Sequence, residues 1–413
     1  MRKVIVIGGG AGGMMAAIYA ARAGADVTLL ERNEKLGKKV YITGKGRCNV
    51  TNDCTIDEFL REVPRNPRFL YSALSFLNPQ GVMELLEDEG CPVVTQRGRR
   101  VFPATEKSSD VIRTLSRTLS AAGVDIRLNS RVKAVNQQDG AVSGVTLMSG
   151  ETLQADAVIL ATGGKSYPMT GSSGDGYAFA MAAGHTVIPA SAVLSAIETA
   201  AEWPKRLQGL SLKNVTLTLK KGKKTLYTEL GEMLFTHFGI SGPLTLTMSC
   251  HLPDNLADAQ VTLDLKPGLD MQQLDARLQR EFESQPRKQL LNVLPSLLPG
   301  RMAEEFPAIC GVDGGKQCCQ VTREEREKLC QALKALPIAL SRLRPLDEAI
   351  VTRGGVAVKE INPATMESKL LPGLYFAGEV MDVDAHTGGY NLQIAWSTGA
   401  LAGQAAAEEP ISW

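Results

Sequence analysis

The sequence lacks a surplus of charge of either sign. Among its 413 residues, 45 Lys and Arg stand against 44 Asp and Glu, which leaves a net charge of +1. Such a balance argues against a protein built mainly to hold nucleic acid or to coat an anionic membrane. We therefore expect a small-molecule substrate and neither nucleic acid nor a membrane as partner; the oligomeric state has no signature in the sequence.

Cysteine pairs of the metal-binding kind and long apolar runs are also missing. The eight cysteines include no Cys-x-x-Cys motif, which disfavours a zinc site and suits reduced thiols. No apolar run reaches the ~18 residues that span a bilayer. The apolar run near Met1 stops at Gly8, which is too early for a signal peptide. We predict a cytoplasmic protein without a metal site.

Glycine is the residue in excess, with 40 in the chain, and its clusters mark the functional features. The first cluster lies in a β-α-β pattern, in which apolar runs at residues 3–7 and 25–30 flank an alanine-rich helical stretch. Between the first strand and the helix stands Gly8-x-Gly10-x-x-Gly13, the spacing of a dinucleotide-binding fingerprint.

Each part of this fingerprint has a physical role. Gly8 permits the turn, Gly10 lets the backbone approach a diphosphate, and Gly13 lets helix and strand pack closely. The free N–H groups and the dipole at the helix start favour phosphates. Glu31 closes the second strand, where its carboxylate can accept both ribose hydroxyls and would repel a 2′-phosphate. The pattern therefore disfavours NADP at this position.

Two later glycine turns favour FAD over NAD. The segments 161–164 (ATGG) and 377–379 (AGE) both end apolar strands, and such strand ends open onto one crevice in an open α/β sheet. A helix start at 388–391 (GGYN) can stabilise negative charge on a reduced flavin. A site built from both chain ends suits a long ligand. No second fingerprint follows a strand, so NAD(P)H is expected at most as a transient electron donor.

The middle of the chain has a different pattern of apolar residues from the two ends. Alternating residues at 212–219 and 261–265 indicate an antiparallel sheet or barrel, and residues 270–335 show helical periodicity. We predict an α/β protein of three parts: a Rossmann-type FAD-binding domain at 1–190 and 359–413, a β-barrel-like insert at 191–268 and 337–358, and a helical insert at 269–336.

Several long motifs carry a resemblance to a known family. They are TGKGRCNVTN at 43–52, GRRVFP at 98–103, ATGGKSYP at 161–168, LFTHFGISGP at 234–243, and the segment 376–391. On these motifs the chain resembles the YhiN/BaiN-like, or aminoacetone-oxidase-like, flavoproteins over nearly its whole length. Two departures stand out: Lys45, where many members have glycine, and an extra arginine between Gly98 and Val101.

The resemblance implies non-covalent FAD, a discontinuous FAD domain with the two inserts, and an oxidoreductase. Family substrates include amino ketones and unsaturated steroid ketones. We expect hydride transfer between flavin N5 and a small or steroid-like carbonyl or amine. The residues expected to bind the cofactor are Gly8, Gly10, Ala11, Gly12, Gly13, Glu31, Arg32, Gly46, Arg47, Cys48, Asn49, Val132, Ala161, Thr162, Gly163, Gly164, Gly378, Glu379, Gly388, Gly389, Tyr390 and Asn391.

The catalytic acid has two candidates, His237 and His386. His237 follows an apolar run in a Gly/Ser-rich turn of the insert, and His386 lies among acids beside the last glycine cluster. Alternative readings are a barrel-locking histidine at 237 and a thiol–disulfide flavoenzyme using Cys48 and Cys54. A flavin-dependent tRNA-modifying protein and a flavin-binding scaffold without turnover also stay open. His185, without chemical neighbours in the sequence, is read as incidental.

Overall fold

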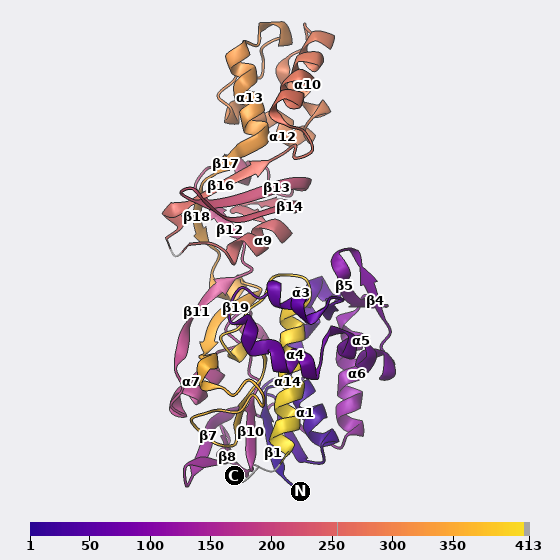
Figure 1. Cartoon of the computed structure of the whole chain (residues 1–413), viewed down its shortest axis with the longest axis vertical. Coiled ribbons are helices and arrows are strands. Elements are labelled where there is room, and N and C mark those ends of the chain that lie inside the picture. The colour runs from indigo at the N-terminus through magenta and orange to yellow at the C-terminus, as the bar shows by residue number, and fades with distance from the viewer. Residues whose placement is uncertain (254, 409–413) are drawn as a thin grey trace. The chain divides into compact units, whose positions relative to one another are not determined.

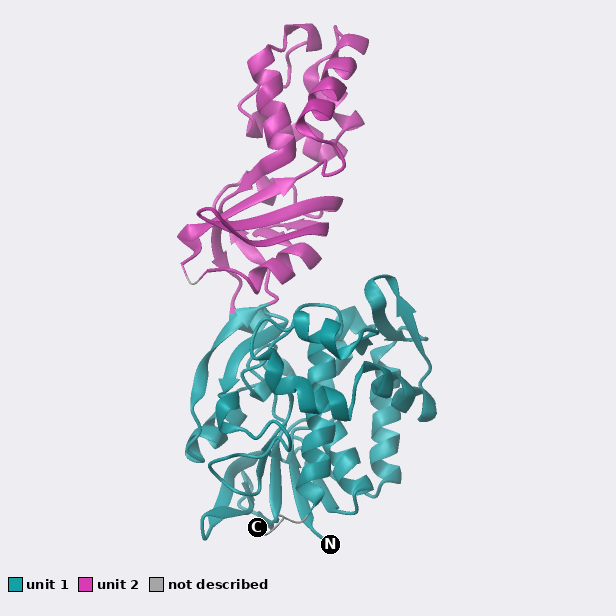
Figure 2. Ribbon diagram, in the orientation of Figure 1, with its two compact units in different colours: residues 1–193, 346–413 teal, residues 194–345 magenta. Residues whose placement is uncertain are grey.

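The computed structural model describes residues 1–253 and 255–408. Contacts between residues divide the chain into two compact units, unit 1 at 1–193 and 346–413 and unit 2 at 194–345 (Figure 2). Each is taken by itself below. Within the described residues, no helix combines the length and the apolar character that crossing a membrane requires.

Unit 1 is built on a parallel sheet with the strand order β20-β10-β1-β2-β6. Figure 1 labels two of its strands, β1 and β10. Its strands are β1 Lys3–Ile7, β2 Asp26–Leu30, β6 Asp125–Arg127, β10 Ala157–Leu160 and β20 Leu374–Phe376. In β10 every side chain is buried, as expected for a parallel strand covered on both faces. Because β20 from the C-terminal part pairs with β10, both chain ends share one sheet.

Smaller sheets and the helices complete unit 1. The strands are β3 Thr51–Asn52, β4 Val93–Gln96 and β5 Arg100–Pro103; β7 Val132–Gln138, β8 Ala141–Leu147 and β9 Thr152–Gln154; and β11 Val187–Val193 with β19 Val351–Val356. The α-helices are α1 Ala11–Arg22, α2 Lys38–Ile42, α3 Ile56–Arg61, α4 Tyr71–Phe76, α5 Pro79–Asp88, α6 Ser108–Ala121, α7 Asp175–Ala182 and α14 Tyr390–Ala407. The 3-10 turns are η1 Thr43–Gly46, η2 Pro67–Leu70, η3 Arg97–Arg99, η4 Pro168–Thr170, η8 Leu346–Glu348, η9 Val358–Glu360 and η10 Gly378–Val380.

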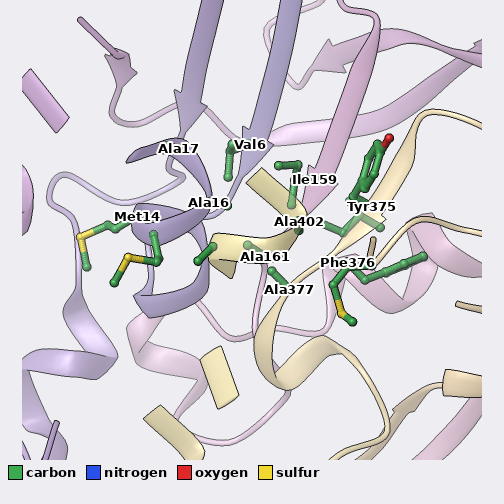
Figure 3. Packing of buried hydrophobic residues seen from close by; sticks show 14 of the residues in the cluster. Val6, Met14, Ala16, Ala17, Ile159, Ala161, Tyr375, Phe376, Ala377 and Ala402 are labelled. Carbon is green, nitrogen blue, oxygen red and sulfur yellow. The ribbon is translucent and has the colours of Figure 1, made fainter. Parts of the chain in front are cut away.

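The helices α1 and α14 cross at very short range. A Cβ atom at Gly399 would lie 2.3 Å from the carbonyl oxygen of Gly12, and one at Gly403 would lie 2.2 Å from that of Ala16. The crossing therefore needs glycine at both positions of α14. Figure 3 shows Ala16 and Ala402 among the small buried side chains of this region. The contact fixes the last helix against the helix that follows the fingerprint.

Unit 2 contains a seven-stranded antiparallel sheet and a group of helices. The strand order is β17-β16-β13-β14-β15-β12-β18. The strands are β12 Ile197–Thr199, β13 Ser211–Lys221, β14 Lys224–Thr236, β15 Gly239–Ser241, β16 Ala259–Asp264, β17 Leu336–Ile338 and β18 Leu340–Leu343. The helices and turns are α8 Trp203–Arg206, α9 Pro243–Ser249, η5 Leu256–Asp258, α10 Met271–Ser284, α11 Leu290–Val293, η6 Leu294–Ser296, α12 Gly300–Ile309, η7 Cys318–Gln320 and α13 Arg323–Ala335.

The helices of unit 2 begin and pack as their sequences dictate. Asp270 and Thr322 each form a capping box at the start of α10 and α13. The predicted apolar stripe of α10 is buried and joins the core of the sheet. Sheet and helices thus share one hydrophobic core in one unit. Residues 351–356, which we expected in the insert, form β19 in unit 1, where they pair with β11.

Candidate functional site

A cleft opens at the carboxyl ends of the parallel strands of unit 1, where ligands of open α/β sheets bind. It encloses about 1340 Å³, counting the solvent at its mouth. Segments from both chain ends line it, among them residues 7–12, 37–40 and 377–379. The predicted cofactor residues that line the cleft are Gly8, Gly10, Ala11, Gly12, Glu31, Arg32, Val132, Ala161, Thr162, Gly163, Gly378, Glu379 and Asn391.

Two glycines of the fingerprint serve different purposes: packing of the fold requires Gly13, and space for a ligand lies at Gly10. A Cβ atom at Gly13 would lie 1.7 Å from the carbonyl oxygen of Gly8, so the fold itself excludes a side chain there. At Gly10 a Cβ atom would meet no described atom within 4 Å, although the residue lines the cleft. The space in front of Gly10 is therefore free for a ligand. It lies at the N-terminus of α1, where the helix dipole favours negative charge.

Glu31 is buried at the end of β2 and is held by backbone donors. The N–H of Gly9 donates to Oε2 at 2.7 Å, and the N–H and side-chain amide of Asn33 donate to Oε1 at 2.8 and 2.7 Å. These bonds fix the carboxylate at the cleft wall. The unused lone pairs of its two oxygens can accept the hydroxyl protons of a ribose.

Beyond Glu31 the cleft wall carries a cluster of two arginines and one acid. Asp175 accepts hydrogen bonds from Arg131 at 3.1 and 3.2 Å and from Arg32 at 3.2 Å. Burial acts to raise the pKa of Asp175, but hydrogen bonds from Arg131 and Ser173 and both positive charges outweigh burial and lower the pKa. Arg32 is thus positioned by an acid more than 140 residues away, which the sequence did not indicate.

A lysine-centred network in the same cleft was missed by sequence reasoning. Lys39 Nζ lies 2.6 Å from Ser166 Oγ and 2.7 Å from Glu379 Oε2. The N–H of Thr352 donates to the other oxygen of Glu379 at 2.8 Å, and Thr352 Oγ1 accepts from the backbone of residues 165 and 166. The network joins the segments after β2 and β10 to β19 and η10. Lys39, one of two adjacent lysines, has no distinguishing signal in the sequence.

Three predicted cofactor residues present buried polar atoms that the protein leaves without a partner: Arg47 Nε, Asn49 Oδ1 and Thr162 Oγ1. Asn49 Oδ1 and Thr162 Oγ1 are buried and accept or donate no hydrogen bond within residues 1–253 and 255–408. A buried polar atom without a partner carries a cost of about 1–3 kcal/mol, which a bound ligand can remove. Thr162 lines the cleft and Asn49 does not. Together with the space at Gly10 and the position of Glu31, the Oγ1 of Thr162 fits a dinucleotide laid across the cleft.

The last glycine cluster does not line the cleft at Gly388, Gly389 or Tyr390; only Asn391 does. A Cβ atom at Gly389 would lie 2.3 Å from the carbonyl oxygen of Thr51, so that glycine lets the loop pack on β3. The ring of Tyr390 packs edge-to-face on Phe59. Asn391 closes the loop through bonds to the backbone of Ala385 at 3.0 and 2.7 Å.

The segment 46–48 also lies outside the cleft lining, as do Gly13, Asn49 and Gly164. Arg47, which we expected to bind the cofactor, forms an ion pair with Glu106 and stacks on Phe102, with its guanidinium carbon 4.3 Å from the ring centroid. Cys48 and Cys54 are buried free thiols, and burial raises the pKa of each to about 12. Thiols with so little thiolate at neutral pH are poor redox nucleophiles, which counts against the thiol–disulfide alternative.

The histidines have different surroundings. His386 Nδ1 lies 2.9 Å from Glu62 Oε2, and its backbone N–H donates to the carbonyl of Glu62 at 2.9 Å. His237 is an exposed residue of unit 2 whose ring packs against Phe238. His185, read as incidental, is buried with Nε2 2.7 Å from Ser368 Oγ and Nδ1 3.5 Å from Glu360. Its partners lie over 170 residues away along the chain, which is why the sequence did not show them.

Comparisons with known proteins agree with this geometry. The HI0933-like protein Rossmann domain matches residues 2–405. A 3-dehydro-bile acid delta(4,6)-reductase of Clostridium scindens is 32% identical over 99% of this chain and 100% of its own length. A ribosomal RNA dihydrouridine synthase of Escherichia coli K12 is 31% identical over 95% of each chain.

Solved structures show the same fold at low identity. A 3-ketosteroid-Δ4-(5α)-dehydrogenase from Rhodococcus jostii RHA1, in complex with 4-androstene-3,17-dione, gives a TM-score of 0.53 at 17% identity and covers 99% of this chain and 97% of its own. A 3-ketosteroid Δ1-dehydrogenase from Sterolibacterium denitrificans gives 0.54 at 14% identity, covering 98% of this chain and 100% of its own. The chain belongs to the HI0933-like Rossmann-domain family and is an FAD-dependent oxidoreductase.

Proposed function

We propose that this FAD-dependent oxidoreductase of the HI0933-like family reduces a carbon–carbon double bond that is conjugated to a carbonyl group. The observation that carries the proposal is what two full-length relatives have in common. One is named as a delta(4,6)-reductase of a 3-dehydro-bile acid, and the other as a dihydrouridine synthase. In a 3-oxo steroid these double bonds extend the ketone, and in uridine the reducible bond is conjugated to a ring carbonyl. The two names describe one kind of reaction on different substrates.

The reaction balances with one external reductant. FAD held in this cleft would, once reduced, supply hydride chemistry, in which two electrons leave the flavin with one hydride. The substrate accepts the hydride at the β-carbon and a proton at the α-carbon, so its double bond becomes single. NAD(P)H, binding transiently, returns the two electrons and leaves as NAD(P)⁺. The FAD is held without a covalent bond.

The cleft residues hold the cofactor by complementary groups. The backbone at Gly10 and the start of α1 receive the diphosphate, since that position is open and electropositive. Glu31 accepts the ribose hydroxyls from its fixed position. Thr162, which lines the cleft, completes its hydrogen bonding on the cofactor. Lys39 and Glu379 orient the segments that meet in the same cleft.

His386 is the proposed proton donor in unit 1. Its ring is oriented by Glu62, and the histidine lies in the loop that leads to Asn391 at the cleft wall. His237 of unit 2 stays a second candidate. Glu62→Gln tests the assignment: because the variant loses the carboxylate that orients the His386 ring, kcat for substrate reduction should fall while the FAD content stays unchanged.

The reaction class can be tested with the holoenzyme under anaerobic conditions. The flavin is reduced with NADH or NADPH, and its visible absorbance is followed after addition of a 3-oxo-Δ4 steroid, a uridine-containing RNA, or the corresponding saturated ketone. We expect reoxidation by at least one conjugated compound and none by the saturated one. Reduction of the oxidised flavin by an amine such as aminoacetone, with no response to either conjugated compound, would overturn the proposal in favour of an amine oxidase.

A further inference from the structure

One stretch of the cofactor cleft is lined by an irregular segment of the chain. Residues 167–174 lie between β10 and α7, and those at 170–173, which we name the wall segment, line the cleft. Within 167–174 the only regular element is the short turn η4, and Tyr167, Gly171 and Gly174 have φ values in the left-handed region. The position of the wall segment therefore depends on the contacts that it makes with other parts of unit 1.

Asn33 joins the wall segment to the acid at the end of β2. Its side-chain Nδ2 donates to the carbonyl of Thr170 at 3.0 Å and to Glu31 Oε1 at 2.7 Å. Its side-chain oxygen accepts from Lys38 Nζ at 3.3 Å. Only this orientation of the amide suits its neighbours, since an ionised Glu31 can only accept and Lys38 can only donate. One amide group thus holds Glu31 and the wall segment together.

Two further contacts fix the wall segment beside the residues that follow Glu31. A Cβ atom at Gly171 would lie 2.6 Å from Nδ2 of Asn33, so glycine at this position lets the segment approach the amide. Arg32 donates to Ser173 Oγ at 2.6 Å. Because Thr170 and Ser173 are its first and last residues, the wall segment is held at both ends by the two residues directly after Glu31.

We infer that Asn33 is a positioning residue that fixes Glu31 and the wall segment in one arrangement and thereby slows the release of FAD; this rests on the proposed binding of the cofactor ribose at Glu31. A cleft wall that is ordered before binding spares the ligand the cost of ordering it. Without this amide, part of the free energy of FAD binding would go into ordering Glu31 and the wall segment. Affinity differences between variants of one site appear mainly in the dissociation rate. The sequence did not indicate the role, because Thr170 lies 137 positions from Asn33.

The positioning role is tested on the full chain by the kinetics of FAD binding. The test variant is Asn33→Ala. The matched control is Asn136→Ala, which removes a half-buried asparagine of β7 that accepts a hydrogen bond from Thr146 at 3.0 Å. Dissociation is followed by the recovery of flavin fluorescence after dilution of the holoprotein, and association by stopped-flow mixing of FAD with apoprotein.

We expect the dissociation rate constant of FAD to rise about 10-fold in Asn33→Ala, which corresponds to one hydrogen bond of ordinary strength. The association rate constant should stay close to that of the wild type, and the control should leave both constants unchanged. Urea unfolding of the two apoproteins shows whether each variant is folded. Wild-type dissociation in Asn33→Ala, or an equal rise in Asn136→Ala, would overturn the inference.

Asn33→Asp separates hydrogen bonding from packing. The two side chains have the same shape, but a carboxylate has no hydrogen to donate and would face the oxygens of Glu31 and Thr170. At about pH 8, FAD should therefore dissociate at least as fast as from Asn33→Ala. Two adjacent carboxylates bind a shared proton at a higher pH than a single carboxylate does, so at about pH 5 a donor returns and the rate should approach that of the wild type. Wild-type dissociation of Asn33→Asp at both pH values would show a packing role and overturn the inference.

Glu31→Ala separates the role of Asn33 from the proposed function. Wild-type FAD affinity in Glu31→Ala would remove the proposed position of the ribose, and the role of Asn33 with it. Unaltered dissociation in Asn33→Ala, together with a loss of affinity in Glu31→Ala, would remove only the role of Asn33. Reduction of a 3-oxo-Δ4 steroid by the wild-type holoenzyme tests the reaction class independently of both variants.

Discussion

Substitution of Gly10 by alanine should separate cofactor binding from folding. The new methyl group meets no described atom within 4 Å, and the backbone at φ −81° and ψ −167° is accessible to alanine. Alanine is a poorer N-cap than glycine but reduces the freedom of the unfolded chain, and each effect amounts to about 0.5–1 kcal/mol. The free energy of unfolding of the apoprotein should therefore stay within about 1 kcal/mol of wild type.

The methyl group projects instead into the space that receives the diphosphate. Displacing a phosphate by one methyl group removes at least one hydrogen bond to a charged group, worth about 1.5–3 kcal/mol. The dissociation constant of FAD should rise about 10- to 100-fold. Quenching of flavin fluorescence on titration into apoprotein measures the affinity, and urea unfolding of the same preparation measures stability.

Gly13→Ala is the matched variant. Its methyl group would lie 1.7 Å from the carbonyl oxygen of Gly8, so α1 must move away from the strand end. Overpacking of this kind costs about 1–3 kcal/mol or more, and the loss should appear in the apoprotein. Two results would refute the reasoning: wild-type FAD affinity in Gly10→Ala, or a loss of apoprotein stability in Gly10→Ala equal to that in Gly13→Ala.

Three further predictions follow from the contacts of unit 1. Lys39→Met should lower the free energy of unfolding by about 1–2 kcal/mol, because it removes the cation beside Glu379. The double variant Lys39→Met/Glu379→Gln should recover part of this loss. Equal losses in the single and the double variant would contradict the pairing of Lys39 with Glu379. Cys48→Ser should keep wild-type turnover and show no charge-transfer band on partial reduction, because the thiol is buried with a pKa of about 12; loss of turnover with FAD still bound would restore the thiol mechanism. Burial lowers the pKa of His185 against the opposing charge of Glu360. The folded protein therefore favours the neutral form of His185. The stability that depends on this form is fully present above the unfolded-state pKa of about 6.5 and is lost as the pH falls through the folded-state pKa. The free energy of unfolding, measured with urea, should therefore fall more steeply below about pH 6.5 in the wild type than in His185→Gln. Parallel curves for the two proteins would exclude the effect.

The FAD-binding fold could be predicted because its signals are local or repeated. The β-α-β pattern, the glycine spacing and Glu31 all lie within the first 31 residues. Together they belong to one dinucleotide-binding unit, built around the turn after the first strand. The strand ends at 161–164 and 377–379 could be assigned to the same crevice because parallel strands end at one edge. Helical periodicity likewise predicted α10 and α13.

Contacts between distant segments were beyond the sequence. The bond of Lys39 to Glu379 and that of Arg32 to Asp175 join residues 340 and 143 positions apart, and nothing in either local pattern indicates its partner. Arg47 looked like a phosphate ligand because it lies in a glycine loop, but Glu106 and Phe102 compete for its guanidinium. The strand at 351–356 lies in unit 1 because it pairs with β11 and bonds to Glu379, contacts that join it to distant segments of the chain.

A single-turnover mass balance tests the central claim most directly. Holoenzyme reduced anaerobically and freed of excess reductant is mixed with a 3-oxo-Δ4 steroid or a uridine-containing RNA, and the product is quantified by mass spectrometry beside the flavin spectrum. The account predicts one product, heavier by two hydrogens at the former double bond, for every FAD that is reoxidised. Reoxidation without such a product, or a reduced flavin that neither compound reoxidises, would contradict it.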